Sequence, residues 1–182
     1  MSISPGTYEL GPQDGRLTLR TSRSGAAQKA GHDLLIEVQT WGATAQIAED
    51  PARSVLELTA DSRSLNVLEG TGGIKALTED DKASIAKTID KEVLKGTPIT
   101  FRSTAVRPEG GDRFHVTGDL ELANGVNLVA FDISVGDGGH VAGSAIVKQT
   151  EWGIKPYTAL FGALKVADEV QVAIDATLRP VS

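Results

Sequence analysis

Short stretches in which apolar and polar residues alternate run through most of this chain, separated by glycine, proline, asparagine and aspartate. This period of two is typical of β-strands with one buried face and one face in water. The clearest runs are Leu34 to Gln39, Leu56 to Asp61, Phe114 to Leu122, which Gly118 interrupts, Val129 to Val135, and Val170 to Arg179. The pattern predicts a chain built mainly of strands.

Turn residues between these runs predict tight reversals of the chain. Asn124-Gly125 is the sharpest signal, because both residues tolerate the positive φ of a two-residue type I′ hairpin. Further turns are expected at Pro108 to Gly111 and at Asp137 to Gly139. From about residue 98 onward we therefore expect a β-meander.

One segment has a helical period instead. Between Asp80 and Lys95, apolar residues recur at spacings near 3.6, and acidic residues come early, as the helix dipole favours. Thr78 and Asp81 have the spacing of a capping box, and Gly96 followed by Pro98 would end the helix. The apolar residues of this predicted helix are Ile85, Ile89, Val93 and Leu94.

Length and composition favour one domain over residues 1–182. The chain has 182 residues, of which 40% are hydrophobic and 23% charged, as in ordinary globular proteins. Many strands and one helix fit an antiparallel β-barrel with one end covered. A closed barrel of about eight strands is either filled by side chains or holds one small ligand. Because only 4% of the residues are aromatic, we expect a hollow interior.

The formal net charge of −6 makes nucleic acid an improbable partner, since phosphate arrays attract concentrated positive charge and would on average repel this chain. No apolar run is long enough for a membrane-spanning helix. The N-terminus has neither the basic start nor the apolar stretch of a secretory signal, so we expect a cytoplasmic protein. The oligomeric state stays open, a homodimer included.

Motifs for catalysis and cofactor binding are missing. Neither a dinucleotide-binding nor a Walker A loop occurs, and we interpret Gly70 to Gly73 as a flexible loop. Cysteine is absent, and His32, His115 and His140 stand far apart, so no metal site or cofactor is expected. The pair His32-Asp33 has two interpretations. It either fixes the loop that enters a strand, or it contacts a ligand head group or acts as a base.

Several segments together resemble the YceI-like family. The run from Lys91 to Val106 (KEVLKGTPITFRSTAV) contains a helix end and a P-x-I-x-F-x-S strand. A T-G-D-L-x-L hairpin follows within Val116 to Leu122, before Asn124-Gly125. Gly6 to Tyr8 and Trp152 to Lys155 lie where that family has an initial strand and a D-F-G-I-like segment. The match covers nearly the whole chain.

This resemblance implies an extended, lipocalin-like barrel of about eight antiparallel strands with one amphipathic α-helix against it. It also implies a long apolar tunnel that binds polyisoprenoids or similar amphiphiles, and no catalytic residues. We expect a protein that binds, carries or sequesters an apolar chain, such as a polyisoprenoid or a fatty-acid derivative. The alternatives are an enzyme for a lipophilic substrate with His32 and Asp33 at the pocket mouth, and a stress-related interaction domain with a filled barrel. The expected ligand-binding residues are Leu34, Ile36, Leu58, Phe101, Phe131, Ile133, Phe161, Trp152 and His32.

Overall fold

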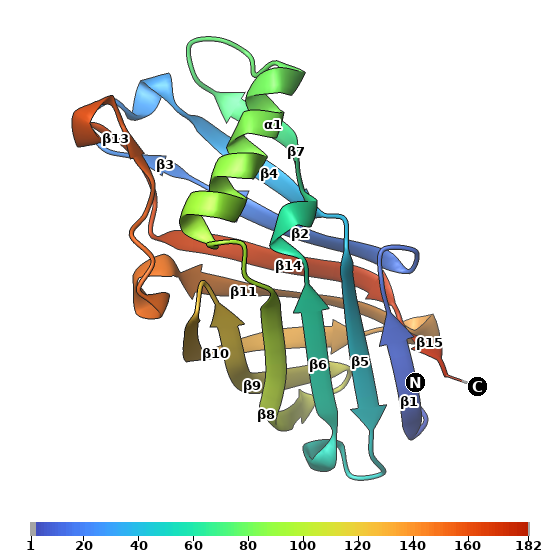
Figure 1. Cartoon of the computed structure of the whole chain (residues 1–182). Helices are drawn as coiled ribbons and strands as arrows, with labels where there is room; N and C mark the ends of the chain where they lie inside the picture. The colour runs from blue at the N-terminus through green and yellow to red at the C-terminus, as the bar shows by residue number, and fades with distance from the viewer. Residues whose placement is uncertain (1–2, 182) are drawn as a thin grey trace.

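The computed structural model describes residues 3–181, and each alternating run of the sequence forms a β-strand in it (Figure 1). Within these residues twelve strands form one antiparallel sheet in the order β15-β1-β5-β6-β8-β9-β10-β11-β14-β2-β4-β7. Its strands are β1 (Gly6–Leu10), β2 (Gly15–Thr21), β4 (His32–Val38), β5 (Trp41–Ile47), β6 (Val55–Ala60), β7 (Leu65–Gly72), β8 (Ile99–Gly110), β9 (Arg113–Leu122), β10 (Gly125–Val135), β11 (His140–Lys148), β14 (Glu169–Thr177) and β15 (Arg179–Pro180).

A second, small sheet lies beside one end of the first. It has the order β12-β13-β3, from β12 (Thr158–Ala159), β13 (Leu164–Val166) and β3 (Arg23–Ser24). The predicted all-β, lipocalin-like class is confirmed, but the main sheet has more than the eight strands expected. Bends that divide long strands into two, together with very short edge strands such as β15, account for the higher number.

One such bend curls the main sheet. Only residues 39 and 40 separate β4 from β5, and β7 and β6 run antiparallel beside them across the same corner. On its other side β4 pairs with β2, whereas β5 pairs with β1. The bend therefore joins strands near opposite ends of the sheet order, so that the sheet wraps around one interior (Figure 1).

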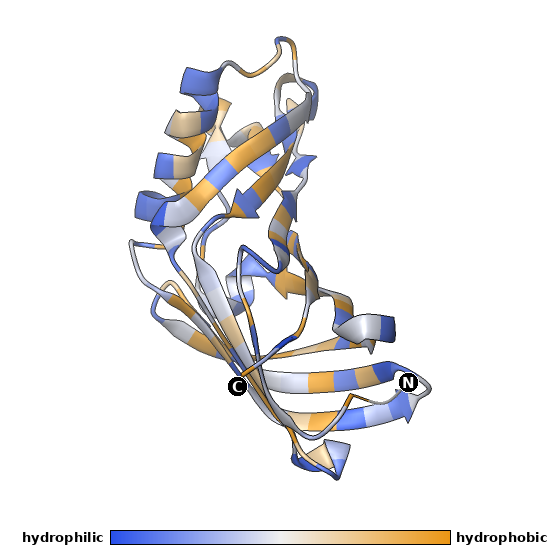
Figure 2. Cartoon of the chain, turned by 90° about the vertical axis from the view of Figure 1, so that its right-hand side faces the viewer, coloured by the Kyte–Doolittle hydropathy of each residue, from blue (hydrophilic) through white to orange (hydrophobic). Residues whose placement is uncertain are grey.

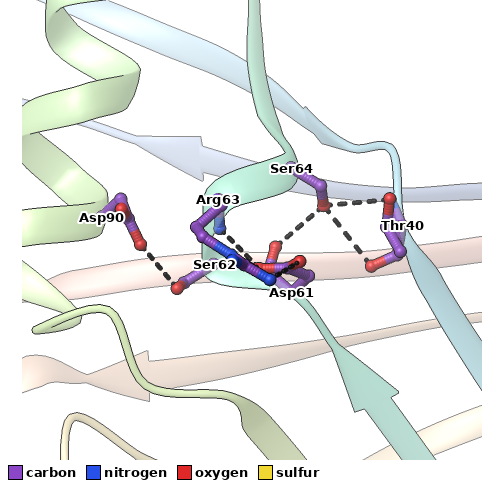
Figure 3. A network of polar contacts seen from close by, with 6 residues as sticks. All are labelled: Thr40, Asp61, Ser62, Arg63, Ser64 and Asp90. Carbon is purple, nitrogen blue, oxygen red and sulfur yellow. Dashed lines mark hydrogen bonds and ion pairs between the residues drawn. The ribbon is translucent and has the colours of Figure 1, made fainter.

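Hydrogen bonds of the turn between β6 and β7 secure this corner (Figure 3). The Ser64 hydroxyl donates to the carbonyl oxygen of Asp61 at 2.8 Å and accepts from the backbone N–H of Thr40 at 2.9 Å. The Asp61 carboxylate accepts two hydrogen bonds from the Arg63 guanidinium, at 3.0 and 2.9 Å. Backbone groups that are not paired within the sheet at the bend thus form hydrogen bonds with the Ser64 side chain.

The predicted helix is confirmed, with a shorter regular part. Helix α1 spans Glu79–Thr88, and a π-helical turn, Ile89–Val93, continues it. The capping box of Thr78 and Asp81 is present as predicted. At the other end Lys95 and Gly96 both have positive φ, which ends the helix before Pro98. Helix α1 packs beside β7, the last strand of the sheet order, and so covers an edge (Figure 1).

The predicted β-meander is present, because β8, β9, β10, β11 and β14 are consecutive neighbours. Its sharpest turn, however, lies one residue earlier than predicted. Leu122 pairs with Gly125, and the two turn residues with positive φ are Ala123 and Asn124. Gly125 serves a different purpose, since a Cβ there would lie only 2.8 Å from the carbonyl oxygen of Trp152.

The interior side of the sheet is apolar and its exterior mainly polar, as the alternation predicts, although Val126, Leu128 and Ile146 are exposed on the outer face of β10 and β11. Figure 2 shows hydrophobic and hydrophilic residues succeeding one another along the strands. Val116 and Ile36 are the most completely enclosed apolar side chains, at 0% and 1% exposure. Ile36 belongs to one cluster of buried apolar side chains that unites the inward faces of the strands, and this interior is where a ligand would bind.

Candidate functional site

The sheet and helix α1 surround a cavity of about 740 Å³. Most of its wall consists of aliphatic side chains from the inward faces of the strands. A volume of this size lies within the ~300–1,000 Å³ of small-molecule sites in proteins. Representative wall residues are Leu19, Leu34, Ile36, Leu58, Leu120, Val129, Ile133, Val172 and Ile174.

Seven of the nine expected ligand-binding residues line this cavity. Six of them are apolar and come from four strands that are distant in sequence, β4, β6, β8 and β10. The seventh, His32, lies at the end where β4 begins. The six apolar residues are Leu34, Ile36, Leu58, Phe101, Phe131 and Ile133.

The other two expected residues lie outside the lining. Trp152 is 5% exposed and packs in the core, where its indole N–H donates to the carbonyl oxygen of Leu120 at 2.7 Å. Phe161 is fully exposed in the turn between β12 and β13. Trp152 therefore packs behind the cavity wall, and Phe161 points into solvent.

Two aromatic rings form part of the wall. The Phe101 and Phe131 ring centroids are 5.4 Å apart, with the planes tilted by 56°. Between their strands lies β9, where Gly118 interrupts the alternation; a Cβ on Gly118 would come within 2.6 Å of the Phe101 ring. The absence of a side chain at Gly118 thus makes room for the Phe101 ring.

Helix α1 and the π-turn close part of the cavity with residues that we did not name as ligand-binding. Ile85, Ile89, Val93 and Leu94 all line it. These are the four apolar positions whose spacing predicted the helix. The helical period was therefore the signal that could have assigned them to the site, because an apolar helix stripe in a β-protein must face the interior.

A small polar cluster lies where the cavity meets the start of β4. The Arg23 guanidinium donates to the carbonyl oxygen of Gly31 at 2.6 Å, and the backbone N–H of Arg23 donates to the Asp33 carboxylate at 2.8 Å. The His32 ring nitrogen Nε2 is 2.7 Å from the carbonyl oxygen of Lys75. These contacts fit the interpretation that His32 and Asp33 fix the chain at the strand start.

The glycines from 70 to 73 do not form the flexible loop that we expected. Gly70 and Gly72 belong to strand β7, and only Gly73 lies beyond it. A Cβ would collide with the Leu77 side chain at Gly70, with the Arg23 guanidinium at Gly72, and with the His32 ring at Gly73. The glycines are therefore positions of close packing against the cavity mouth.

The hydrogen bonds that cap the start of helix α1 determine the charge state of the Asp81 carboxylate. The backbone N–H and the hydroxyl of Thr78 both donate to the Asp81 carboxylate, at 2.9 and 2.8 Å. These hydrogen bonds lower the pKa of Asp81 below its ordinary value. Asp81 also lines the cavity, so a negative charge stands at this end of it.

The described part of the chain holds no group of three or more histidine, aspartate or glutamate side chains placed to bind a metal ion. The histidines contact different partners. His115 lies 2.7 Å from Asp132 and His140 lies 2.9 Å from Asp175. None of the helices in residues 3–181 is long and apolar enough to cross a membrane.

In a comparison with protein families, the YceI-like domain matches residues 9–178 of this chain. The chain belongs to the YceI-like family. The resemblance seen in the sequence motifs is thereby confirmed over almost the whole YceI-like chain. No curated protein matches the sequence.

Solved structures share the fold of this YceI-like protein. BcnA of Burkholderia cenocepacia is 17% identical and superimposes with a TM-score of 0.64, over 90% of this chain and 94% of BcnA. The YCEI protein of Campylobacter jejuni is 13% identical, with a TM-score of 0.57 over 81% of this chain and 84% of that protein. At these identities the likeness extends to the fold alone.

Proposed function

We propose that this YceI-like protein binds one apolar chain molecule, a polyisoprenoid or a related lipid, inside the cavity, and that it carries or sequesters this ligand. The observation that supports the proposal is the cavity of about 740 Å³ with walls of aliphatic and aromatic side chains. Apolar cavities of this kind favour apolar ligands over water, because water finds few polar partners there.

Affinity would grow with the length of the ligand. Burial of each CH₂ group contributes about 0.8 kcal/mol, so a prenyl or acyl chain needs few polar contacts. The wall residues come from a rigid, hydrogen-bonded sheet, so the shape of the site is largely formed before the ligand enters.

The polar side chains of the mouth suggest the orientation of the ligand. Arg23, His32, Tyr157 and Lys165 line the cavity at the end near the small sheet. The opposite part of the wall contains Leu10, Leu17, Val141 and Leu178. The hydrocarbon chain therefore lies deep in the sheet, and the polar head of the ligand stays at the mouth.

Neither alternative has comparable support. A base for catalysis needs a ring nitrogen or carboxylate directed at the substrate, whereas the contacts of His32 Nε2 with the Lys75 carbonyl and of the Asp33 carboxylate with the Arg23 backbone N–H join neighbouring segments of the chain. A filled barrel would leave no cavity, whereas the interior here is open between Phe131, Ile133 and the helix.

Two measurements test the proposal. Native mass spectrometry of freshly purified protein should detect an apolar adduct, and a fluorescent polyene fatty acid should bind at one site per chain. Ala145→Phe fills the cavity with an apolar ring, because Ala145 lines it. This variant should lose about tenfold or more of the probe affinity without losing thermal stability.

Ala130→Phe is the matched control, since Ala130 is exposed on the outer face of β10. It should bind the probe as the unmodified protein does. If Ala145→Phe folds correctly and binds the probe normally, the ligand does not occupy this cavity and the proposal fails.

A further inference from the structure

Four large apolar side chains stand in water on two loops near one end of the cavity. Ile74 is 82% exposed, in the loop between β7 and α1. Tyr157, Leu160 and Phe161 are 44%, 55% and 112% exposed, around β12 and the turn that follows it. Single exposed apolar residues are ordinary, but a group of them around an opening indicates an interaction site.

Contacts with a third segment bring these two loops to the same end of the molecule. His32 Nε2 lies 2.7 Å from the carbonyl oxygen of Lys75, next to Ile74. The backbone N–H of Ala27 donates to the carbonyl oxygen of Ala163 at 2.9 Å. Residues 25–32 therefore hold both loops, and Figure 1 shows this segment, β13 and the loop before α1 gathered at the top.

The same segments form the mouth of the cavity. Gly31, Leu77, Ala159 and Leu164 line the cavity from the three segments. Tyr157 both lines it and is substantially exposed, which shows that the cavity reaches solvent here. We call the segments 25–31, 73–77 and 153–165 together the rim.

Leu160 and Phe161, which we call the tip of the rim, have an unusual backbone conformation. Leu160 and Phe161 have φ values of 50° and 55°, a conformation that non-glycine residues seldom adopt. Two consecutive residues of this kind hold the Phe161 ring away from the protein. A conformation that is unfavourable for both the backbone and the side chain in water indicates a partner that receives the ring.

The charge of the rim differs from that of the chain. The segments of the rim contain Lys29, Lys75, Lys155 and Lys165, and no aspartate or glutamate, although the whole chain has a net charge of −6. Carboxylates border these segments, because Asp33 lies at the start of the neighbouring strand β4 and Glu79 to Asp81 form the first turn of α1. The average charge predicts repulsion from anionic surfaces, whereas the charged side chains of the three rim segments themselves are all lysines. Apolar tips between lysines are complementary to a lipid surface, which offers hydrocarbon beneath a layer of phosphate groups.

We propose that the rim docks on a lipid bilayer, with Ile74, Leu160 and Phe161 inserted among the headgroups and the lysines beside the phosphates. In this position the cavity mouth faces the membrane. A lipid then passes from the bilayer into the cavity without crossing water. Docking stands on the rim alone, whereas this loading route also rests on the proposed function.

Tryptophan fluorescence tests the docking directly. Phe161→Trp places a reporter at the tip, while Trp41 and Trp152 are 6% and 5% exposed and stay shielded. Adding vesicles of phosphatidylcholine should shift the emission of this variant to shorter wavelength. Vesicles that also contain phosphatidylglycerol should bind more tightly at low salt.

Removal of the tip should remove the binding. Leu160→Ser combined with Phe161→Ser should weaken sedimentation with vesicles by about tenfold or more. Val126→Ser combined with Leu128→Ser is the matched control, since these two residues are 63% and 55% exposed on the outer face of β10. The control should bind vesicles like the unmodified protein.

Three results would overturn docking. The first is equal vesicle binding by the rim variant and the control. The second is a parallel loss of affinity for the soluble polyene probe in the rim variant, because the tip would then belong to the ligand site. The third is a protein dimer in ultracentrifugation that only the rim variant dissociates. If the probe does not bind the unmodified protein but vesicles do, docking stands and the proposed ligand function fails.

Discussion

Ser62 donates a hydrogen bond of 2.6 Å from its hydroxyl to the Asp90 carboxylate, and this bond joins the bend of the sheet to the end of the helix (Figure 3). Ser62 is only 2% exposed. Ser62→Ala should lower the free energy of unfolding by about 1.5–3 kcal/mol, the usual range for a hydrogen bond to a charged group. Urea denaturation followed by circular dichroism measures the change.

Ser134→Ala is the control for this substitution, because Ser134 is exposed and its hydroxyl makes only a 3.3 Å hydrogen bond to Ala142. It should change the free energy of unfolding by no more than about 0.5 kcal/mol. Equal stability of the two variants would show that the bond to Asp90 does not secure the corner.

A substitution at Gly73 affects stability both through its positive φ and through contact with the His32 ring, and a comparison with Gly138 separates the two effects. Gly73 and Gly138 have similar φ values, 76° and 72°, but a Cβ would meet the His32 ring at Gly73 and no atom within 4 Å at Gly138. Gly73→Ala should therefore destabilise the protein more than Gly138→Ala, by about 1–3 kcal/mol. Thermal unfolding compares the two variants.

A double variant that lacks the His32 ring tests this explanation. In a His32→Ala background the ring is gone, so the extra cost of Gly73→Ala should disappear and the double variant should resemble Gly138→Ala. Persistence of the extra cost would mean that something other than the ring opposes a side chain at this position.

Ligand affinity should depend on the wall and not on the polar mouth. Ile133→Asp places a carboxylate in the apolar cavity, with a desolvation penalty of several kcal/mol, whereas His32→Ala removes a side chain that contacts the Lys75 carbonyl. Titration with the polyene probe should show a far larger loss for Ile133→Asp. Leu128→Asp, on the outside of the same strand, controls for the added charge.

Correct folding of each variant must be checked by circular dichroism before affinities are compared. If His32→Ala abolishes binding or turnover of the natural ligand while a folded Ile133→Asp protein binds it normally, the wall does not carry the function and the enzyme alternative gains support.

Acid should weaken the start of the helix. The pKa of Asp81 is lowered in the folded protein by hydrogen bonds from Thr78, chiefly from its backbone N–H. A lowered folded pKa contributes stability that is complete above the unfolded value of about 4 and is lost as the pH falls through the folded pKa. A carboxyl NMR titration of Asp81 should therefore have its midpoint below that of an unfolded chain.

Thr78→Val removes the hydroxyl partner and keeps the backbone N–H. The midpoint for Asp81 should rise in this variant without reaching the unfolded value. An unchanged midpoint would show that the hydroxyl does not contribute to the lowered pKa.

The sequence by itself determined the elements and much of the wall. Alternation identified the strands because side chains of a strand point to opposite faces, so the inward positions of β4, β6 and β10 could be named without knowing their neighbours. The inward direction of Phe101 in β8 followed instead from the resemblance to the YceI-like family. Local chemistry also determined the start of the helix, since the capping box of Thr78 and Asp81 involves residues only three apart.

Tertiary structure alone decided the features that depend on contacts between distant segments. It placed Trp152 behind the wall, left Phe161 in water, and made the glycines near Gly73 packing positions. It also joined the sheet through the corner between β4 and β5. Each outcome depends on which atoms lie beside a residue after folding, and residues far apart in sequence, such as Gly73 and His32, leave no local pattern that reveals such a contact.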